Sequence, residues 1–234
     1  MLAVFKKDFR AFFVTPIGFV FIGLFVCAMN YVFYSINIYQ NNSDMGTTFS
    51  MVLIAMMLLC PLLTMRTFSE ETKLRTDQLL LTAPVSVTSI VVGKFLSALC
   101  LYFLALLGTL TWPFVINNHG MFMPVTFFSN YTAVLFAGMA FISIGVFLSS
   151  LTESQVVAAV LTFITFGLIY LMSVLSSAVN VPVISAFLDA FSLFSRFNLF
   201  IVGLFPLSNI VYYFSVAFVF LFLTTRILEK KRWA

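Results

Sequence analysis

The chain has 234 residues, of which 62% are hydrophobic and 9% are charged, and its net charge is +4. A water-soluble domain normally carries charge on roughly a quarter of its residues, so this composition excludes a soluble protein and predicts an integral membrane protein. The positive charge does not indicate a nucleic-acid partner, because the Lys and Arg residues border apolar stretches and form no basic face of a soluble domain.

The first segment, residues 1–15, predicts an amphipathic helix that lies along the membrane surface. At 100° per residue one face gathers its apolar side chains, Leu2, Phe5, Phe9, Phe12 and Phe13. The other face gathers Lys6, Lys7 and Arg10. This helix should end near Pro16, since the residue before a proline disfavours helical geometry. A membrane anchor and a gating element remain equally good interpretations.

Apolar stretches long enough to cross a bilayer of ~30 Å follow. They cover residues 17–36, 47–65, 90–116, 128–150, 156–176 and 207–228. Stretches such as FVFIGLFVCAM are apolar on every side, which favours helices over the alternating strands of a barrel. Pro61 is tolerated inside such a helix. We therefore expect an all-α integral membrane protein with six transmembrane helices and a single domain, residues 1–234.

A charged loop, residues 66–89, separates the second and third stretches. Its charged side chains beyond Arg66 are Glu70, Glu71, Lys73, Arg75 and Asp77, and the amide of Gln78 follows them. Membrane topology alone would need only two or three cations here. The mixed charges predict a short helix that presents a polar side to a soluble protein, and a merely solvated surface is the alternative.

Within the apolar stretches, ionisable residues are nearly absent. Lys94 lies near the start of the third, where its side chain could reach the membrane interface. His119 and Glu153 lie in loops, and the three cysteines, Cys27, Cys60 and Cys100, have no metal-binding spacing. We therefore predict no catalytic residue, metal site or cofactor site, and no ion-coupling site in the membrane. Because the chain also lacks a G-x-x-x-x-G-K-[ST] loop, any nucleotide should bind to a partner.

The region 177–206 contains a third amphipathic pattern. Ser185, Asp189, Ser192 and Arg196 recur at helical spacing within an otherwise apolar sequence. This spacing predicts a helix that lies in the interface or re-enters the membrane, with Asp189 and Arg196 paired through Ser192 or open to water. A structural role and ligand binding both remain open.

The distribution of cations predicts the orientation. With both termini in the cytoplasm, eleven of the twelve Lys and Arg residues lie in or beside cytoplasmic segments, and Arg196 is the exception.

Together these features resemble the permease of type 2 ATP-binding-cassette exporters, over the whole chain. The resemblance centres on the loop EETKLRTDQLLLTAPVSVTSIVVGK, matched at Glu70, Glu71, Lys73, Thr76, Leu79, Leu80, Pro84, Val85, Ser86, Gly93 and Lys94. The chain departs from the family at Arg75, where Gly is usual, and at Gln78, where Glu is usual. The closing stretch from residue 203 is most similar to the gliding-motility-type branch.

This resemblance implies a multi-pass protein of the bacterial inner membrane. Its charged loop would be a coupling helix that contacts a separate cytoplasmic ATPase, in which ATP and Mg²⁺ would bind, and Glu153 would add a smaller contact. A six-helix half bundle also implies a second permease copy or a related permease. The small residues Gly138, Gly145 and Ser149 could serve that dimer, or helix contacts within one subunit.

Two functions stay open on this resemblance. The first is export of a substrate driven by the ATPase. The second is a non-transporting subunit that transmits ATP-driven motion to an extracytoplasmic protein, since the branch often includes a membrane-anchored partner with a large extracytoplasmic domain.

Overall fold

The structure is a computed structural model, and it describes the chain except for residues 41, 43, 77–84, 120–122, 179–188, 190, 191 and 234. Most of the described residues are helical, and they include no strand. Six helical segments are long and apolar enough to cross a membrane: Ile17–Ile38, Met45–Lys73, Val87–Asn117, Pro124–Leu151, Gln155–Ala178 and Leu207–Arg232. These segments agree with the six predicted from the sequence, and the chain is a multi-pass membrane protein.

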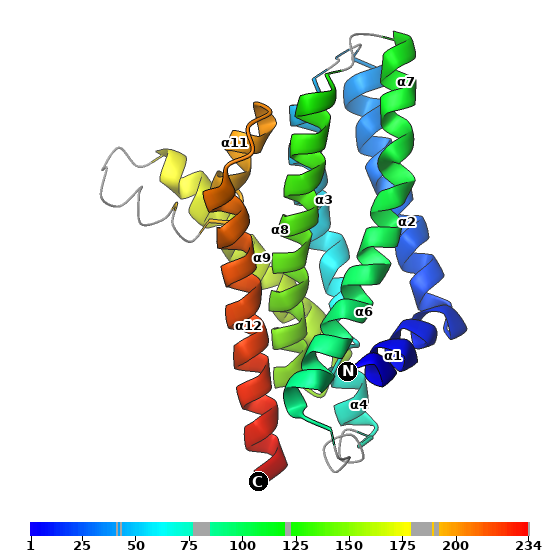
Figure 1. Ribbon diagram of the computed structural model, residues 1–234, viewed down its shortest axis with the longest axis vertical. Coiled ribbons are helices and arrows are strands. Elements are labelled where there is room, and N and C mark those ends of the chain that lie inside the picture. Colours follow the sequence, from blue (N-terminus) through cyan, green and yellow to red (C-terminus); the bar gives the residue numbers. More distant parts are fainter. Residues whose placement is uncertain are drawn as a thin grey trace.

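Long helices run the length of the molecule in a single bundle (Figure 1). The principal helices are α1 (Leu2–Val14), α2 (Ile17–Phe33), α3 (Met45–Thr64), α4 (Ser69–Lys73), α6 (Val87–Leu107), α7 (Trp112–His119), α8 (Pro124–Leu151), α9 (Gln155–Ala178), α11 (Asn198–Ile201) and α12 (Leu207–Trp233). Short 3-10 segments, Gly108–Thr111 and Ser195–Phe197, precede α7 and α11, and a π-helical turn, Tyr34–Ile38, extends α2.

Helix α8 is the centre of the bundle and packs against α3, α6, α9 and α12. A side chain at Gly138 would lie 2.4 Å from the ring of Tyr102, and one at Gly145 would lie 2.2 Å from Thr64 Oγ1. Glycine is required at both positions because these neighbours already fill the space. The sequence left open whether these small residues pack within one subunit or against a second one. In the structure, Gly138 and Gly145 pack against helices of the same chain.

Aromatic packing joins the helices at the α7 end of the bundle. The indole of Trp112 stacks on Phe33 with ring centroids 4.9 Å apart, and its Nε1–H donates to Asn30 at 2.8 Å. Helix α3 begins here after Asp44, whose carboxylate accepts a hydrogen bond from the backbone N–H of Gly46 at 2.9 Å and so caps the helix.

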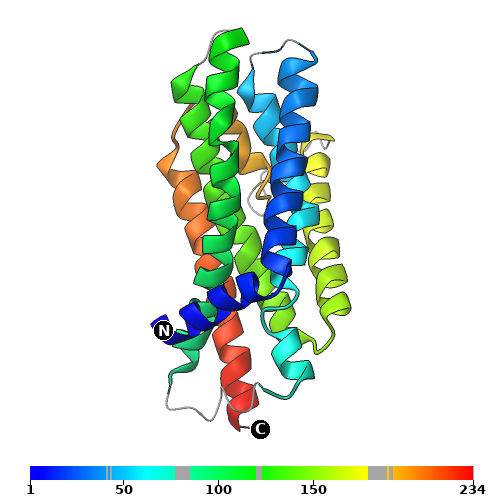
Figure 2. The same ribbon diagram turned by 90° about the vertical axis from the view of Figure 1, so that its right-hand side faces the viewer.

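At the other end, α1 lies across the bundle, on the same side as α4 and both chain termini (Figures 1 and 2). It packs closely on α6 at Gly93, where an added side chain would lie 3.1 Å from Val4. Along α1 the ring of Phe5 stacks on that of Phe9 with centroids 5.6 Å apart, and Phe13 meets Phe9 edge to face at 5.1 Å. The predicted N-terminal amphipathic helix is therefore formed, with Lys6, Lys7 and Arg10 on its exposed side.

Candidate functional site

A buried lysine organises the end of the bundle where α1, α4 and α6 meet. Lys94 is only 3% exposed, and its ammonium lies 3.2 Å from Asp8 Oδ2 and 2.9 Å from Glu71 Oε2. The same Nζ donates a hydrogen bond to the carbonyl oxygen of Thr67 at 2.8 Å and lies 5.1 Å from the ring centroid of Phe68. Lys94 was predicted to have a side chain that could reach the membrane interface, and the structure shows that these partners bury its ammonium within the protein.

A second cation completes this arrangement from α1. Lys7 Nζ donates to Glu71 Oε1 at 2.9 Å and lies 4.0 Å from Asp8 Oδ1. We call Lys7, Asp8, Glu71 and Lys94 the charge cluster. It contains two cations and two carboxylates and joins three helices that are distant in the sequence. Burial raises the pKa of Asp8 above its usual 3.8, because the loss of water outweighs the attraction of Lys94.

The start of α4 is positioned by α8. Ser149 Oγ accepts hydrogen bonds from the backbone N–H groups of Phe68 and Ser69, at 3.1 and 3.2 Å. These are two of the amide groups that a helix start leaves without an internal partner. The charged loop is thereby attached to the central helix of the bundle by its backbone as well as by its side chains.

The two glutamates predicted to contact an ATPase both bind within the chain. Glu70 forms an ion pair with Arg66 one helical turn earlier, and Glu71 belongs to the charge cluster. At the end of α4 the exposed residues are instead Lys73, Leu74, Arg75 and Thr76. Asp77 and Gln78, which were predicted to belong to the same contact, lie outside the described residues.

Arg75 ends α4 in a left-handed backbone conformation, with φ of 56°. This geometry directs the chain away from the helix axis, and residues other than glycine adopt it at a cost of roughly 1–2 kcal/mol. Arginine at this position therefore makes the local backbone less stable than glycine would.

A cavity of about 340 Å³ opens beside the charge cluster. Helix α1 lines it with Lys7, Asp8, Ala11 and Phe12, Thr15 follows directly after α1, and α2 adds Ile17. The α4 region contributes Arg66, Thr67, Glu70, Glu71, Leu74 and Thr76, and α6 contributes Lys94 and Ser97. The cavity thus combines ion pairs with an apolar wall.

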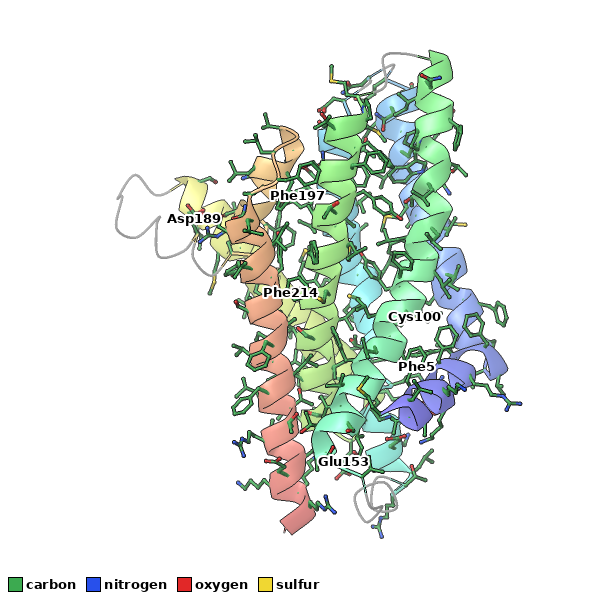
Figure 3. All side chains as sticks on the ribbon, in the orientation of Figure 1. Phe5, Cys100, Glu153, Asp189, Phe197 and Phe214 are labelled. Atoms are coloured by element: carbon green, nitrogen blue, oxygen red, sulfur yellow. The ribbon has the colours of Figure 1, made fainter. Side chains whose placement is uncertain are left out.

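Glu153, the remaining predicted contact, is exposed between α8 and α9 (Figure 3). It lies toward the same end of the bundle as α4. The structure thus leaves its side chain accessible to a partner.

The predicted stripe of the 177–206 region is only partly formed. Ser185 lies outside the described residues, and from Ser192 to Ile201 the chain forms a turn, a 3-10 turn and the short α11, so the prediction of one continuous helix is wrong for these residues. Tyr213, on α12, donates a hydrogen bond to the carbonyl oxygen of Leu193 at 2.9 Å, and Asn209 donates to that of Arg196 at 2.7 Å. These bonds from α12 favour the bent path over a straight helix.

Asp189 and Arg196 do not form an ion pair with each other. Asp189 Oδ1 accepts a hydrogen bond from Ser176 of α9 at 2.7 Å, and the guanidinium of Arg196 lies 5.3 Å from the ring centroid of Tyr212. Ser192, predicted to bridge them, is buried and accepts from the backbone N–H of Ser195 at 3.1 Å. Hydrogen bonds from Ser176 and Ser195 lower the pKa of Asp189 below its usual 3.8.

The sequence analysis did not identify Asp8 as a site residue, and it did not predict that Lys94 would have ion-pair partners within the protein. Both had a detectable signal: Asp8 lies about 40° from Phe12 on the helical wheel, beside the apolar face, and Lys94 follows the helix start by two turns in an apolar stretch. An ionisable side chain in such a stretch should be assigned a partner before it is assigned to the interface.

No group of three or more His, Cys, Asp or Glu side chains that could hold a metal ion occurs in the described part of the chain. The three cysteines are free. In comparisons with models of known protein families and with curated proteins, the sequence matches none.

Proposed function

We propose that this chain is the transmembrane permease subunit of a type 2 ATP-binding-cassette transporter. In this proposal a separate cytoplasmic ATPase binds ATP and Mg²⁺ and hydrolyses the ATP, and the permease itself catalyses no reaction. Helix α1 is its interfacial helix, the α4 region is its coupling helix, and residues 177–206 form an extracytoplasmic re-entrant region.

The orientation rests on the cations. Eleven of the twelve belong to α1, the α4 region, the first turns of α6 and the last turns of α12, and Arg196 lies apart. Cationic segments are retained on the cytoplasmic side, so the α4 end should face the cytoplasm and with it both termini. The bacterial inner membrane is the location that the family resemblance implies.

The observation that carries the proposal is the attachment of α4 to the bundle. Its exposed end presents Lys73, Leu74 and Arg75, while Glu71 binds cations of α1 and α6 and the α4 start binds Ser149 of α8. A partner that pushes on the exposed end would therefore move three bundle helices together. A merely solvated loop would not require these long-range bonds.

The structure changes which residues we assign to the ATPase contact. Because Glu70 and Glu71 bind within the chain, the contact should depend on Lys73 and Arg75, with Leu74 between them. Two exposed cations beside an exposed leucine would be complemented by an acidic surface with an apolar pocket. Lys6 and Arg10 on α1 and Glu153 after α8 are exposed and could add smaller contacts.

A second copy of the chain or a related permease completes the proposal. Apolar side chains are exposed along α9 and α12, among them Phe163, Leu168, Leu171, Phe214 and Phe218. In a membrane these faces can contact lipid or another permease. Because the core of one subunit is packed with side chains, a transport path would have to lie between two subunits.

A specific observation favours the second function, transmission of motion to an extracytoplasmic partner. Lys94 is the buried charged side chain of the described bundle, and it lies near one end, whereas the middle is filled by residues such as Phe25, Phe141 and Phe166. The described core thus offers no path lined by charged side chains within one subunit, and it suits rigid transmission along α8. The partner would then be a membrane-anchored protein with a large extracytoplasmic domain.

Co-purification of the ATPase tests the permease assignment. The affinity-tagged chain, isolated from its own membranes, should bring with it an ATP-hydrolysing protein, and changing Lys73 and Arg75 together to Glu should reduce the recovered ATPase activity at least about tenfold. Reversal of Lys230 and Arg232 to Glu, two exposed cations at the end of α12, is the matched control and should leave the recovery unchanged. Absence of ATPase activity from the wild-type preparation would contradict the proposal.

A further inference from the structure

The cavity beside the charge cluster has features that the proposed function does not use. At about 340 Å³ it falls within the range of ligand pockets, roughly 300–1,000 Å³. One of its walls is formed by α1, the amphipathic helix that crosses the end of the bundle (Figure 2). With α1 in the membrane interface, as proposed above, the walls of the cavity would lie at the level at which phospholipid headgroups adjoin the apolar interior of a bilayer.

The charges around this cavity are balanced. It is lined by three cations, Lys7, Arg66 and Lys94, and by three carboxylates, Asp8, Glu70 and Glu71. Each of these cations contacts at least one of the carboxylates. A purely anionic ligand would have to separate an ion pair and leave a partly buried carboxylate without its partner, which is strongly unfavourable.

A zwitterionic ligand avoids this difficulty. Its phosphate can bind a cation of the wall while its ammonium replaces that cation at the carboxylate. The accessible groups are Lys7, whose side chain is 56% exposed, and the Arg66–Glu70 pair, whose side chains are 23% and 32% exposed. Lys94 and Asp8, at 4% and 14%, form the floor.

The lining also distinguishes between zwitterions. Quaternary ammonium groups are usually bound by several aromatic rings, and Phe12 is the aromatic residue among those lining this cavity. A primary ammonium instead offers three N–H donors, which match the carboxylates of Glu70 and Glu71. Phe12, Ile17 and Leu74 supply an apolar surface for an acyl chain.

We propose that this cavity binds the headgroup of a membrane phospholipid with a primary ammonium and a phosphate, that is, a phosphatidylethanolamine. Bound there, the lipid would connect α1 to the α4 region through its own two charges. The inference does not depend on the ATPase or on transport, and it would stand if the chain had another function in the membrane.

Lipid binding to the purified full-length chain tests this proposal. Native mass spectrometry in detergent would compare phosphatidylethanolamine, phosphatidylcholine and phosphatidylglycerol with identical acyl chains. We expect the first to bind at least about tenfold more tightly than either of the others, a difference of about 1.4 kcal/mol. Equal binding of all three, or a preference for phosphatidylglycerol, would overturn the proposal.

Two variants locate the site. Lys7→Ala removes the accessible cation and should reduce the preference to threefold or less, whereas Lys6→Ala, an exposed neighbour that does not line the cavity, should preserve it. Because Lys7→Ala also removes an ion pair, Ala11→Trp provides a second test that fills the cavity and keeps every charge. Unchanged selectivity in both variants would place the lipid elsewhere.

Competition with a soluble analogue distinguishes binding of a membrane lipid from binding of a water-soluble ligand. Glycerophosphoethanolamine carries the same two charges without acyl chains, and we expect it to compete only at concentrations at least a hundredfold higher. Competition at equal concentration would assign the cavity to a water-soluble ligand and contradict the lipid proposal.

Discussion

The charge cluster and the Asp189 segment both hold ionisable groups beside apolar helices, but the partners of these groups differ. The Asp189 segment comprises Asp189 and residues 192–201. In the cluster, Lys94 is buried and lies within 3.2 Å of carboxylates from two other segments of the chain. In the Asp189 segment, the carboxylate binds a serine and the guanidinium of Arg196 lies over a tyrosine ring.

Burial accounts for the difference. A buried ammonium must be matched by opposite charge, because hydrogen bonds to neutral groups do not replace its hydration. Asp189 and Arg196 are only partly buried, so water can reach part of each side chain, although Nε of Arg196 is itself buried without a hydrogen-bond partner among the described residues. Ion pairs therefore determine how α1, α4 and α6 assemble, whereas hydrogen bonds from α12 determine the path of residues 192–201.

The largest expected effect comes from removing the cation of the charge cluster. Lys94→Met should lower the free energy of unfolding by about 3–5 kcal/mol, because it removes the buried one of the two cations that Asp8 and Glu71 share and leaves these largely buried carboxylates with Lys7 alone. Thermal or denaturant unfolding of the protein in detergent measures this loss. Lys6→Met, on the exposed side of α1, should change stability by less than about 0.5 kcal/mol. Equal effects of the two substitutions would refute the distinction between buried and exposed cations.

An intermediate effect is expected where α12 holds the Asp189 segment. Tyr213 is fully buried and its hydroxyl donates to the carbonyl oxygen of Leu193, so Tyr213→Phe should cost about 1–3 kcal/mol by leaving that carbonyl without its bond. Tyr212→Phe is the matched control, since it retains the ring that faces Arg196. Hydrogen exchange of residues 192–197 should increase in Tyr213→Phe alone, and unchanged exchange would show that other contacts hold the segment.

The smallest effects concern pH and should have opposite signs. Burial raises the folded-state pKa of Asp8, so its contribution to stability should fall as the pH rises from 3.8 toward the raised value. Hydrogen bonds lower the pKa of Asp189, so its contribution should be present above pH 3.8 and should be lost as the pH falls through the lowered value.

Stability profiles of Asp8→Asn and Asp189→Asn measure this contrast. As the pH rises, the stability of the wild-type protein should fall relative to Asp8→Asn. Over the same change it should rise relative to Asp189→Asn. The change at Asp189 should stay below about 0.5 kcal/mol because water screens this group. Slopes of the same sign for the two variants would contradict the assigned environments.

Much of the fold could be predicted because its signals are local. The predicted stretch 90–116 corresponds to Val87–Asn117, and 156–176 corresponds to Gln155–Ala178. Apolar length and helical hydrogen bonding between residues four apart are properties of a short sequence window. The faces of α1 were predictable for the same reason, since they follow from the spacing of its Phe and Lys residues.

The candidate site was predictable only in its residue types. The sequence alone determined that charges gather near α4 and that Lys94 lies in an apolar stretch. It did not determine that Glu71 faces inward, because the cation that Glu71 binds on α1 is 64 residues away and reaches it only when α1 packs on α6 at Gly93.

The same reason explains the error at residues 192–201. Their spacing favours a helix, but the hydrogen bonds that Tyr213 and Asn209 donate from α12 stabilise a bent path. The tertiary structure also decided that Gly138 and Gly145 serve contacts inside the chain. Sequence windows report the conformation that a segment prefers and which face is apolar, whereas the partner of each polar group depends on helices that packing brings together from distant parts of the chain.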